Sequence, residues 1–238
     1  MRWRAGVANV VLSRPGAGNR LSASMARTLM EAAERFEDDD TLTVMTISGA
    51  GRCFCAGFDD DVDPRVVESV AALSKPTVAV LAGDAFDEGL ELALACDLRL
   101  AAPGIRLALS QARRSAMPRF GATQRLARLA GIGWALRMLL ASETLDARSA
   151  LRIGLITYLA ASHRALGPDT VRMANRLKAR GPLALRLAKE AVLAGYDMTL
   201  AQGIRLEEDL YALLQTTHDR AEGVRAFSER RKPLFKGN

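Results

Sequence analysis

Short runs of β-branched and apolar residues alternate with segments of helical periodicity in the first part of the chain, and this alternation limits the possible folds most strongly. Residues 23–37 repeat apolar side chains at helical spacing behind Ser22, which can cap a helix. Strands that alternate with helices are typical of βαβ units and a mostly parallel sheet. We therefore predict an α/β fold whose strands are residues 7–12, 42–47, 77–81 and 98–102.

From Thr123 onward the periodicity is mainly helical, with no internal repeat and no low-complexity linker. The expected helices are residues 123–130, 132–141, 146–152, 169–179, 183–195 and, with breaks, 198–229. We predict an α/β core over residues 1–165 and a C-terminal helical region over residues 166–238. Helical appendages of this kind often mediate assembly.

The formal net charge of +6 leaves three kinds of partner open: nucleic acid, an anionic membrane, or a phosphorylated small molecule. Aromatic residues make up only 5% of the chain and are not interleaved with the basic ones, as a single-strand binder would need. No apolar run approaches the roughly 20 residues that span a bilayer. We therefore expect neither a nucleic acid nor a membrane as partner.

The three cysteines, Cys53, Cys55 and Cys96, are odd in number, and the first two are too close for an ordinary disulfide. The only histidines, His163 and His218, are too few for a metal site with these thiols. The N-terminus lacks the apolar core of a signal peptide. We predict reduced thiols, no metal and a cytoplasmic protein.

The stretch AGDAFDEGLELALACD, residues 82–97, places acidic residues at the start of an apolar helix. We expect Asp84 to be the N-cap, with Asp87 and Glu88 in the first turn, where each acid stabilises the helix dipole by about 0.3–1 kcal/mol. Glu91 has no such explanation, since it lies within the apolar run. A buried carboxylate with a raised pKa suits proton transfer near neutral pH, so Glu91 is a candidate catalytic residue.

A second stretch, GRCFCAGFDDD at residues 51–61, follows the second strand and must turn sharply at Ala56 and Gly57. Backbone N–H groups in such a turn, and at the start of the helix near Asp87, can point at a polarised oxygen. The two elements together can form an oxyanion hole. Glycine-rich loops after strands are common, so this pattern alone does not define a function.

An ordered set of motifs resembles the enoyl-CoA hydratase/isomerase, or crotonase, superfamily over nearly the whole chain. The motifs are GVANVVLSRPGAGNRLS, GRCFCAGFD, SKPTVAVLAGDAFDEGLELALACDLRLAA, PRFGATQRLARLAG, ALRMLLASETLDARSALRIGLI and HDRAEGVRAFSERRKPLFKGN. The resemblance implies a spiral of ββα units forming two roughly perpendicular sheets, and a C-terminal helical region that builds a trimer or a hexamer. It also implies fatty acyl-CoA thioesters as ligands, with coenzyme A as part of the substrate and no separate cofactor.

The resemblance further assigns roles to particular residues. The backbone N–H groups of Phe58 and Glu88 correspond to the oxyanion hole, and Glu91 and Gln111 occupy the positions of the two catalytic carboxylates. The expected substrate and coenzyme A contacts are Phe58, Asp59, Asp60, Asp61, Arg20 and Lys236, the last within a basic C-terminus suited to phosphates.

The chain departs from the family pattern at several points. Asp87-Glu88-Gly89 replaces three glycines, so a carboxylate side chain stands near the oxyanion hole unless it turns outward. Gln111 replaces a glutamate and cannot act as a general acid or base near pH 7. The segment 61–75 is short, and the run Asp59–Asp61 is acidic, which indicates a differently walled entrance.

These observations predict an enoyl-CoA hydratase/isomerase-like enzyme in which Glu91 is the surviving base and Gln111 only orients water. An isomerase that moves one proton fits the same residues. Glu88 and Glu91, three apart on one helix face, are a further candidate carboxylate pair. A non-catalytic acyl-CoA-binding protein is the alternative, and a nucleic-acid binder, which would lose affinity steeply with salt, is a third.

Overall fold

The strand-like runs of the sequence form the larger of two β-sheets in the computed structural model, which describes residues 2–4 and 6–238. The strand order is β1-β2-β3-β5-β7-β10, and only β1 pairs antiparallel with its neighbour. The predicted mostly parallel sheet is thus confirmed. The strands are β1 (Arg2–Arg4), β2 (Val7–Leu12), β3 (Val44–Gly49), β5 (Thr77–Leu81), β7 (Leu98–Ala101) and β10 (Tyr158–Leu159).

A smaller sheet has the order β4-β6-β8-β9, with β9 antiparallel to β8. Its strands are β4 (Cys53–Cys55), β6 (Asp84–Phe86), β8 (Arg106–Ala108) and β9 (Leu145–Asp146). The sequence analysis missed this sheet because each strand has only two or three residues. Alternation of polar and apolar side chains cannot be recognised over so short a length.

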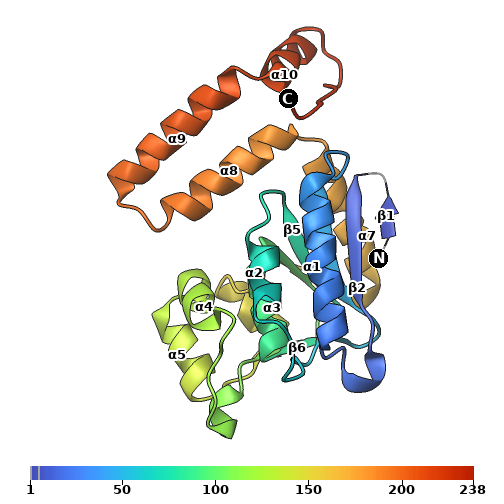
Figure 1. Ribbon diagram of the computed structural model, residues 1–238, viewed down its shortest axis with the longest axis vertical. Coiled ribbons are helices and arrows are strands. Elements are labelled where there is room, and N and C mark those ends of the chain that lie inside the picture. Colours follow the sequence, from blue (N-terminus) through green and yellow to red (C-terminus); the bar gives the residue numbers. More distant parts are fainter. Residues whose placement is uncertain (1, 5) are drawn as a thin grey trace.

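Helices connect and cover the strands (Figure 1). The side chain of Ser22 caps α1 by accepting from Met25 N, as predicted. The expected helix at 169–179 begins earlier, because Ser162 caps it by accepting from Ala165 N, and Pro168 lies inside it. The helices are α1 (Ala23–Asp38), α2 (Arg65–Ala71), α3 (Glu88–Ala95), α4 (Ala122–Ala130), α5 (Ile132–Leu140), α6 (Ala147–Arg152), α7 (His163–Lys178), α8 (Pro182–Gly195), α9 (Leu200–Gln215) and α10 (His218–Ser228), with 3-10 turns η1 (Pro15–Ala17) and η2 (Gln111–Arg114).

The start of α3 differs from the prediction. Asp84 is not an N-cap but lies in β6, where its carboxylate accepts from Arg106 N at 2.8 Å and pairs with the Arg106 guanidinium at 2.6 Å. The helix begins at Glu88, and Asp87 at its N-cap position makes no side-chain cap hydrogen bond. The prediction was wrong because the pairing of Asp84 with Arg106 joins residues distant in sequence.

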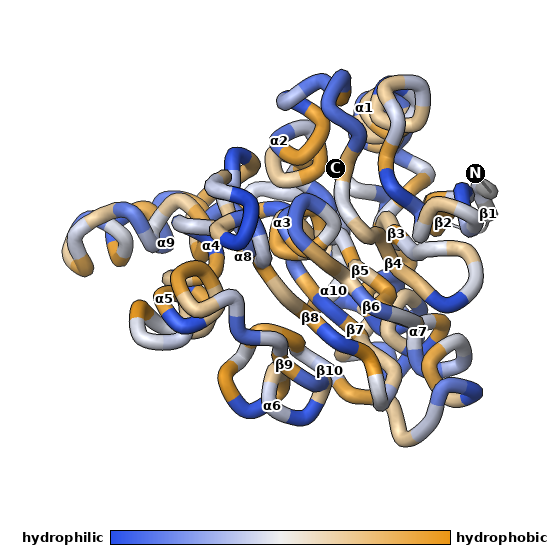
Figure 2. The backbone as a smooth tube through the Cα atoms, turned by 90° about the horizontal axis from the view of Figure 1, so that it is seen from below, coloured by the Kyte–Doolittle hydropathy of each residue, from blue (hydrophilic) through white to orange (hydrophobic). Residues whose placement is uncertain are grey.

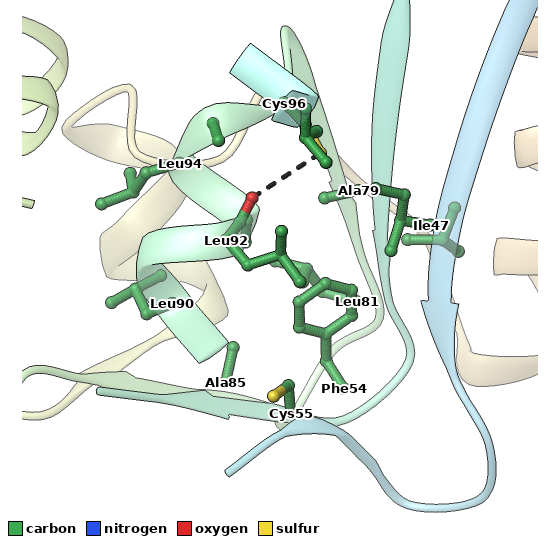
Figure 3. Packing of buried hydrophobic residues seen from close by; sticks show 14 of the residues in the cluster. Ile47, Phe54, Cys55, Ala79, Leu81, Ala85, Leu90, Leu92, Leu94 and Cys96 are labelled. Atoms are coloured by element: carbon green, nitrogen blue, oxygen red, sulfur yellow. Dashed lines mark hydrogen bonds between the residues drawn. The ribbon is translucent and has the colours of Figure 1, made fainter. Parts of the chain in front are cut away.

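Helix α3 is held inside the hydrophobic core, and all its residues from Gly89 to Ala95 are buried. Figure 3 shows Leu92 of this helix pointing toward Phe54 of β4 and Leu81 of β5. The thiol of Cys96, just after the helix, donates to the Leu92 carbonyl oxygen at 3.7 Å. Both sheets therefore fix the position and rotation of the helix that carries Glu91.

The C-terminal helices α8 and α9 extend away from the sheets as an antiparallel pair (Figures 1 and 2). Apolar side chains on this pair are exposed, among them Val192, Tyr196 and Leu200. Helix α7 instead contributes Leu166 and Ala174 to the core, so a boundary at residue 166 falls within a helix. The division into two regions stays a prediction. No helix in the described part of the chain is long and apolar enough to cross a membrane.

Candidate active site

Glu91 lies at the centre of a buried cluster of hydrogen bonds, with no exposed surface. Its Oε2 accepts from two backbone N–H groups, Phe120 N at 2.8 Å and Ala122 N at 3.0 Å. Its Oε1 faces the side chain of Gln111, whose Nε2 donates to it at 3.4 Å. Helix α3, the turn η2 and the start of α4 therefore meet at this one carboxylate.

The partners of Glu91 are all neutral. No cation lies within ion-pair distance of it among the residues that the structure describes. Burial raises the pKa of Glu91, while the N–H groups of Ala122 and Phe120 partly oppose the shift. The structure thus gives Glu91 the raised pKa that the sequence suggested for a proton-transfer group.

Gln111 lies beside Glu91 and is 2% exposed. Its Oε1 has no hydrogen-bond partner among the described residues. Buried polar atoms in proteins are almost always bonded, so this oxygen is suited to accept from a water or from a substrate hydroxyl. The amide of Gln111 thus binds Glu91 through its nitrogen and keeps its oxygen as a free acceptor among the described residues.

Two buried phenylalanines pack against each other, and one of them, Phe120, donates its N–H to the carboxylate. The rings of Phe58 and Phe120 have centroids 5.1 Å apart and are tilted by 60°, and the two residues are 3% and 5% exposed. The sequence analysis missed Phe120, whose N–H binds Glu91, because backbone donors leave no residue-specific signal. The site is therefore apolar on one side and polar around Glu91.

Glu88 turns inward, toward the predicted oxyanion hole. The backbone N–H of Phe58 donates to Glu88 Oε2 at 3.3 Å. Gly57, with φ +129°, lies next to both this carboxylate and Arg20. A Cβ added to Gly57 would be only 2.8 Å from Glu88 Oε2 and 2.8 Å from Arg20 Nη1, so a larger residue would not fit. The Phe58 N–H thus has the carboxylate of Glu88 as its acceptor.

Asp87 has a backbone conformation that favours glycine, φ 49° and ψ −122°. Its carboxylate accepts from Ser110 N at 2.5 Å and Ser110 Oγ at 2.9 Å, and pairs with Arg114 at 3.1 Å. These partners hold the strained residue in place. Gly89, in contrast, has no room for a side chain, because a Cβ there would lie 2.1 Å from the Cys55 carbonyl oxygen.

The other predicted contact residues divide into two groups. Asp59 pairs with Arg14 at 2.5 Å and with Arg20 at 3.3 Å, close to Phe58. The hydrogen bond from Arg14 is the main cause of the lowered pKa of Asp59. The acidic run is thus partly neutralised at the site, a feature that composition alone did not show.

Asp60 and Asp61 are exposed in the turn before α2. Lys236 lies with Asp40 and Lys75 around a hollow at the far end of α1, about 20 Å along that helix from the site. The structure therefore brings together Arg20, Phe58, Asp59, Glu88, Glu91 and Gln111, and leaves Lys236 outside this group within one chain.

Comparisons with known proteins find relatives over nearly the whole chain. The sequence model of the enoyl-CoA hydratase/isomerase family matches residues 2–238. The chain is 35% identical to (E)-benzylidenesuccinyl-CoA hydratase of Thauera aromatica, over 97% of this chain and 95% of that protein. It is 33% identical to 2,3-dehydroadipyl-CoA hydratase of Escherichia coli, over 96% and 94% of the two chains.

The fold agrees as well. The crystal structure of an enoyl-CoA hydratase from Bacillus anthracis superposes with a TM-score of 0.94 at 31% sequence identity, covering 98% of this chain and 96% of the other. The similarity in sequence and fold extends over the whole stretch that builds the site around Glu91. The chain therefore belongs to the enoyl-CoA hydratase/isomerase family, the crotonase superfamily.

Proposed function

We propose that this protein is an enzyme that hydrates or isomerises fatty enoyl-CoA thioesters with a single glutamate. The observation that carries the proposal is the buried Glu91, which is fixed by two backbone N–H groups and has no cation as partner. A carboxylate in this setting can take up and release a proton near neutral pH. The coenzyme A is part of the substrate, and the reaction needs no separate cofactor.

In hydration, a water molecule held between Glu91 Oε1 and the Gln111 amide adds to the β-carbon of the enoyl group. Glu91 takes a proton from this water, and the oxygen forms the new bond to carbon. The electron pair of the double bond moves toward the thioester oxygen, and Glu91 then returns a proton to the α-carbon. Gln111 orients the water and transfers no proton.

The negative charge that develops on the thioester oxygen needs hydrogen-bond donors. The N–H groups of Phe58 and Glu88 are the proposed donors, since one follows the turn at Gly57 and the other begins α3. The side chains of Phe58 and Phe120 exclude water from the same place. An isomerase would use the same donors while Glu91 moves one proton between two carbon atoms.

The names of the two hydratases cited above also favour an acyl-CoA as the substrate, because each acts on a coenzyme A thioester. We further propose a cytoplasmic trimer or hexamer assembled through α8 and α9, whose exposed apolar side chains support such an interface. Lys236 would reach a coenzyme A molecule only if assembly placed it at the site of another copy.

One alternative has support from the site itself. Gln111 replaces the second carboxylate, and the Phe58 N–H is bound by the Glu88 carboxylate. A protein with these changes can bind acyl-CoA without turning it over. The experiment that tests the proposal must therefore measure binding and turnover separately.

We would follow hydration of crotonyl-CoA at the enoyl thioester absorbance, with the unmodified chain beside Glu91→Gln. We expect the variant to lose activity by about 10²–10⁴-fold, because the amide cannot transfer the proton, while butyryl-CoA still binds. Equal rates in the two proteins would contradict the role of Glu91. Tight acyl-CoA binding without turnover on short or long enoyl chains would favour the binder.

A further inference from the structure

The carboxylate of Glu88 occupies the place where a thioester oxygen would bind. Its Oε2 accepts from the Phe58 N–H at 3.3 Å, and that N–H is one of the two donors proposed for the oxyanion hole. One N–H cannot donate to a carboxylate and to a thioester oxygen with good geometry at once. One of the two proposed donors of the hole is therefore bound by a carboxylate of the chain itself.

Neighbouring groups keep the carboxylate in this place. Gly57 leaves the space that Glu88 fills, because a Cβ at Gly57 would lie 2.8 Å from Glu88 Oε2. Gly89 lets α3 pack directly on Cys55, and the helix from Gly89 to Ala95 is buried in the core. The rotation of Glu88 about its own side-chain bonds is the remaining way to free the Phe58 N–H.

Arg20 offers the displaced carboxylate a second position. Its Nε donates to Asp59 at 3.3 Å and its Nη2 donates to the Phe58 carbonyl oxygen. Its Nη1 has no acceptor in the described part of the chain. Both this Nη1 and Glu88 Oε2 lie 2.8 Å from the position that a Cβ of Gly57 would occupy, so the two groups are near each other. A short rotation would thus exchange the Phe58 N–H for a guanidinium as the partner of Glu88.

We propose that Glu88 determines the affinity of this site for thioesters: acyl-CoA binds productively only after the Glu88 carboxylate leaves the Phe58 N–H and moves toward Arg20. This inference rests on the proposed function and adds the residue that controls the oxyanion hole. Coenzyme A without an acyl group does not need the hole, so its binding is independent of Glu88.

The test compares butyryl-CoA with free coenzyme A by calorimetric titration of the full chain and of Glu88→Ala. For the unmodified protein we expect the two dissociation constants to be similar. In Glu88→Ala we expect butyryl-CoA to bind about 10- to 100-fold tighter than coenzyme A, the range that one hydrogen bond to an oxygen bearing partial charge provides. Crotonyl-CoA hydration should rise in the same variant.

Two further variants isolate the cause. Glu88→Gln keeps the size and removes the charge, so its preference for butyryl-CoA should lie between those of the other two proteins. When Glu88 is present, Arg20→Gln should weaken the binding of butyryl-CoA relative to that of coenzyme A. In the Glu88→Ala background it should leave the preference for butyryl-CoA unchanged. Glu31→Ala, an exposed change on α1 that alters the net charge equally, should leave the preference as it is.

The outcomes separate the two proposals. If free coenzyme A binds but the preference is the same with and without Glu88, the inference is wrong and the proposed function stands. A tenfold loss of hydration in Glu88→Ala with unchanged butyryl-CoA binding would also overturn it, since Glu88 would then be a catalytic residue. If no variant binds coenzyme A or butyryl-CoA, both proposals fail.

Discussion

Helices α3 and α10 each carry a buried glutamate three positions after another acidic residue, and the two glutamates differ in their partners. Helix α3 has Glu88 and Glu91 in the site, and α10 has Asp219 and Glu222 beneath the C-terminal tail. Glu222 is 3% exposed and accepts from Arg225 at 2.7 Å, from Arg231 at 2.6 Å and from Leu234 N at 2.9 Å.

The difference between the two buried glutamates is the presence of a cation. Hydrogen bonds from Arg231, then from Leu234 N and Arg225, hold the pKa of Glu222 well below its usual range. Burial raises the pKa of Glu91, whose donors are neutral. The same residue at the same spacing is therefore a fixed anion on α10 and a proton-transfer candidate on α3. The partners that tertiary contacts supply decide the role.

The largest expected effect on activity comes from placing a cation beside Glu91, as Glu222 already has. In Gln111→Lys the ammonium group would take the place of the amide beside Glu91 Oε1, 3.4 Å away in the unmodified protein. An ion pair there would lower the pKa of Glu91 and hold its carboxylate. We expect crotonyl-CoA hydration to fall by about a hundredfold or more, as measured from the initial rate.

Two variants at the same position serve as controls. Gln111→Met removes the hydrogen bond without adding charge, and should lose less activity than Gln111→Lys. Gln111→Glu adds a second carboxylate, which raises the pKa of the pair and supplies a second proton-transfer group, so the rate should rise about tenfold or more. Equal rates in the lysine and glutamate variants would mean that charge near Glu91 does not control the reaction.

A smaller effect is expected on α10. Glu222→Gln removes the anion that binds Arg225, Arg231 and Leu234 N, so the tail should loosen. We expect the melting temperature to fall by about 2–4 °C and the tail to become more sensitive to carboxypeptidase. Hydration by the same sample should stay within a factor of two of the unmodified protein. A large loss of activity without loosening of the tail would contradict a purely structural role.

The smallest effect is the pH dependence of stability, where the two glutamates should have opposite signs. The pKa of Glu91 is raised above 4.5 in the folded protein, so its contribution is fully present below the unfolded pKa and is lost as the pH rises. The pKa of Glu222 is lowered below 4.5, so its contribution is present above the unfolded pKa and is lost as the pH falls.

Urea unfolding of the unmodified protein, Glu91→Gln and Glu222→Gln between about pH 3 and pH 8 measures both slopes, since the Glu222 contribution changes mainly below about pH 4.5. With rising pH, the unmodified protein should lose stability relative to Glu91→Gln and gain stability relative to Glu222→Gln. Slopes of the same sign would refute the distinction between the two environments.

Part of the fold could be predicted from local patterns. The runs that became β2 and β5 are long enough for apolar residues to mark them, and the prediction matched their bounds. The smaller sheet and the true position of Asp84 could not be predicted, since they depend on pairing between β6 and β8. Strands of two or three residues form because they pair with neighbouring strands, and the sequence of one strand does not indicate which strand it will pair with.

The candidate site divides in the same way. The amino-acid sequence by itself determined which side chains are available: Glu91 within an apolar run, Gln111, and the acids Asp87 and Glu88 directly before Gly89. It also determined the family, because the motifs occur in order along the chain.

Only the tertiary structure decided what surrounds each of these side chains. It placed the N–H groups of Phe120 and Ala122 on Glu91, turned Glu88 onto the Phe58 N–H, and kept every cation of the described residues out of ion-pair distance of Glu91. The ionisation of a carboxylate depends on burial and on the charges within a few ångströms. Those neighbours come from segments far apart in sequence, so folding alone brings them to the carboxylate.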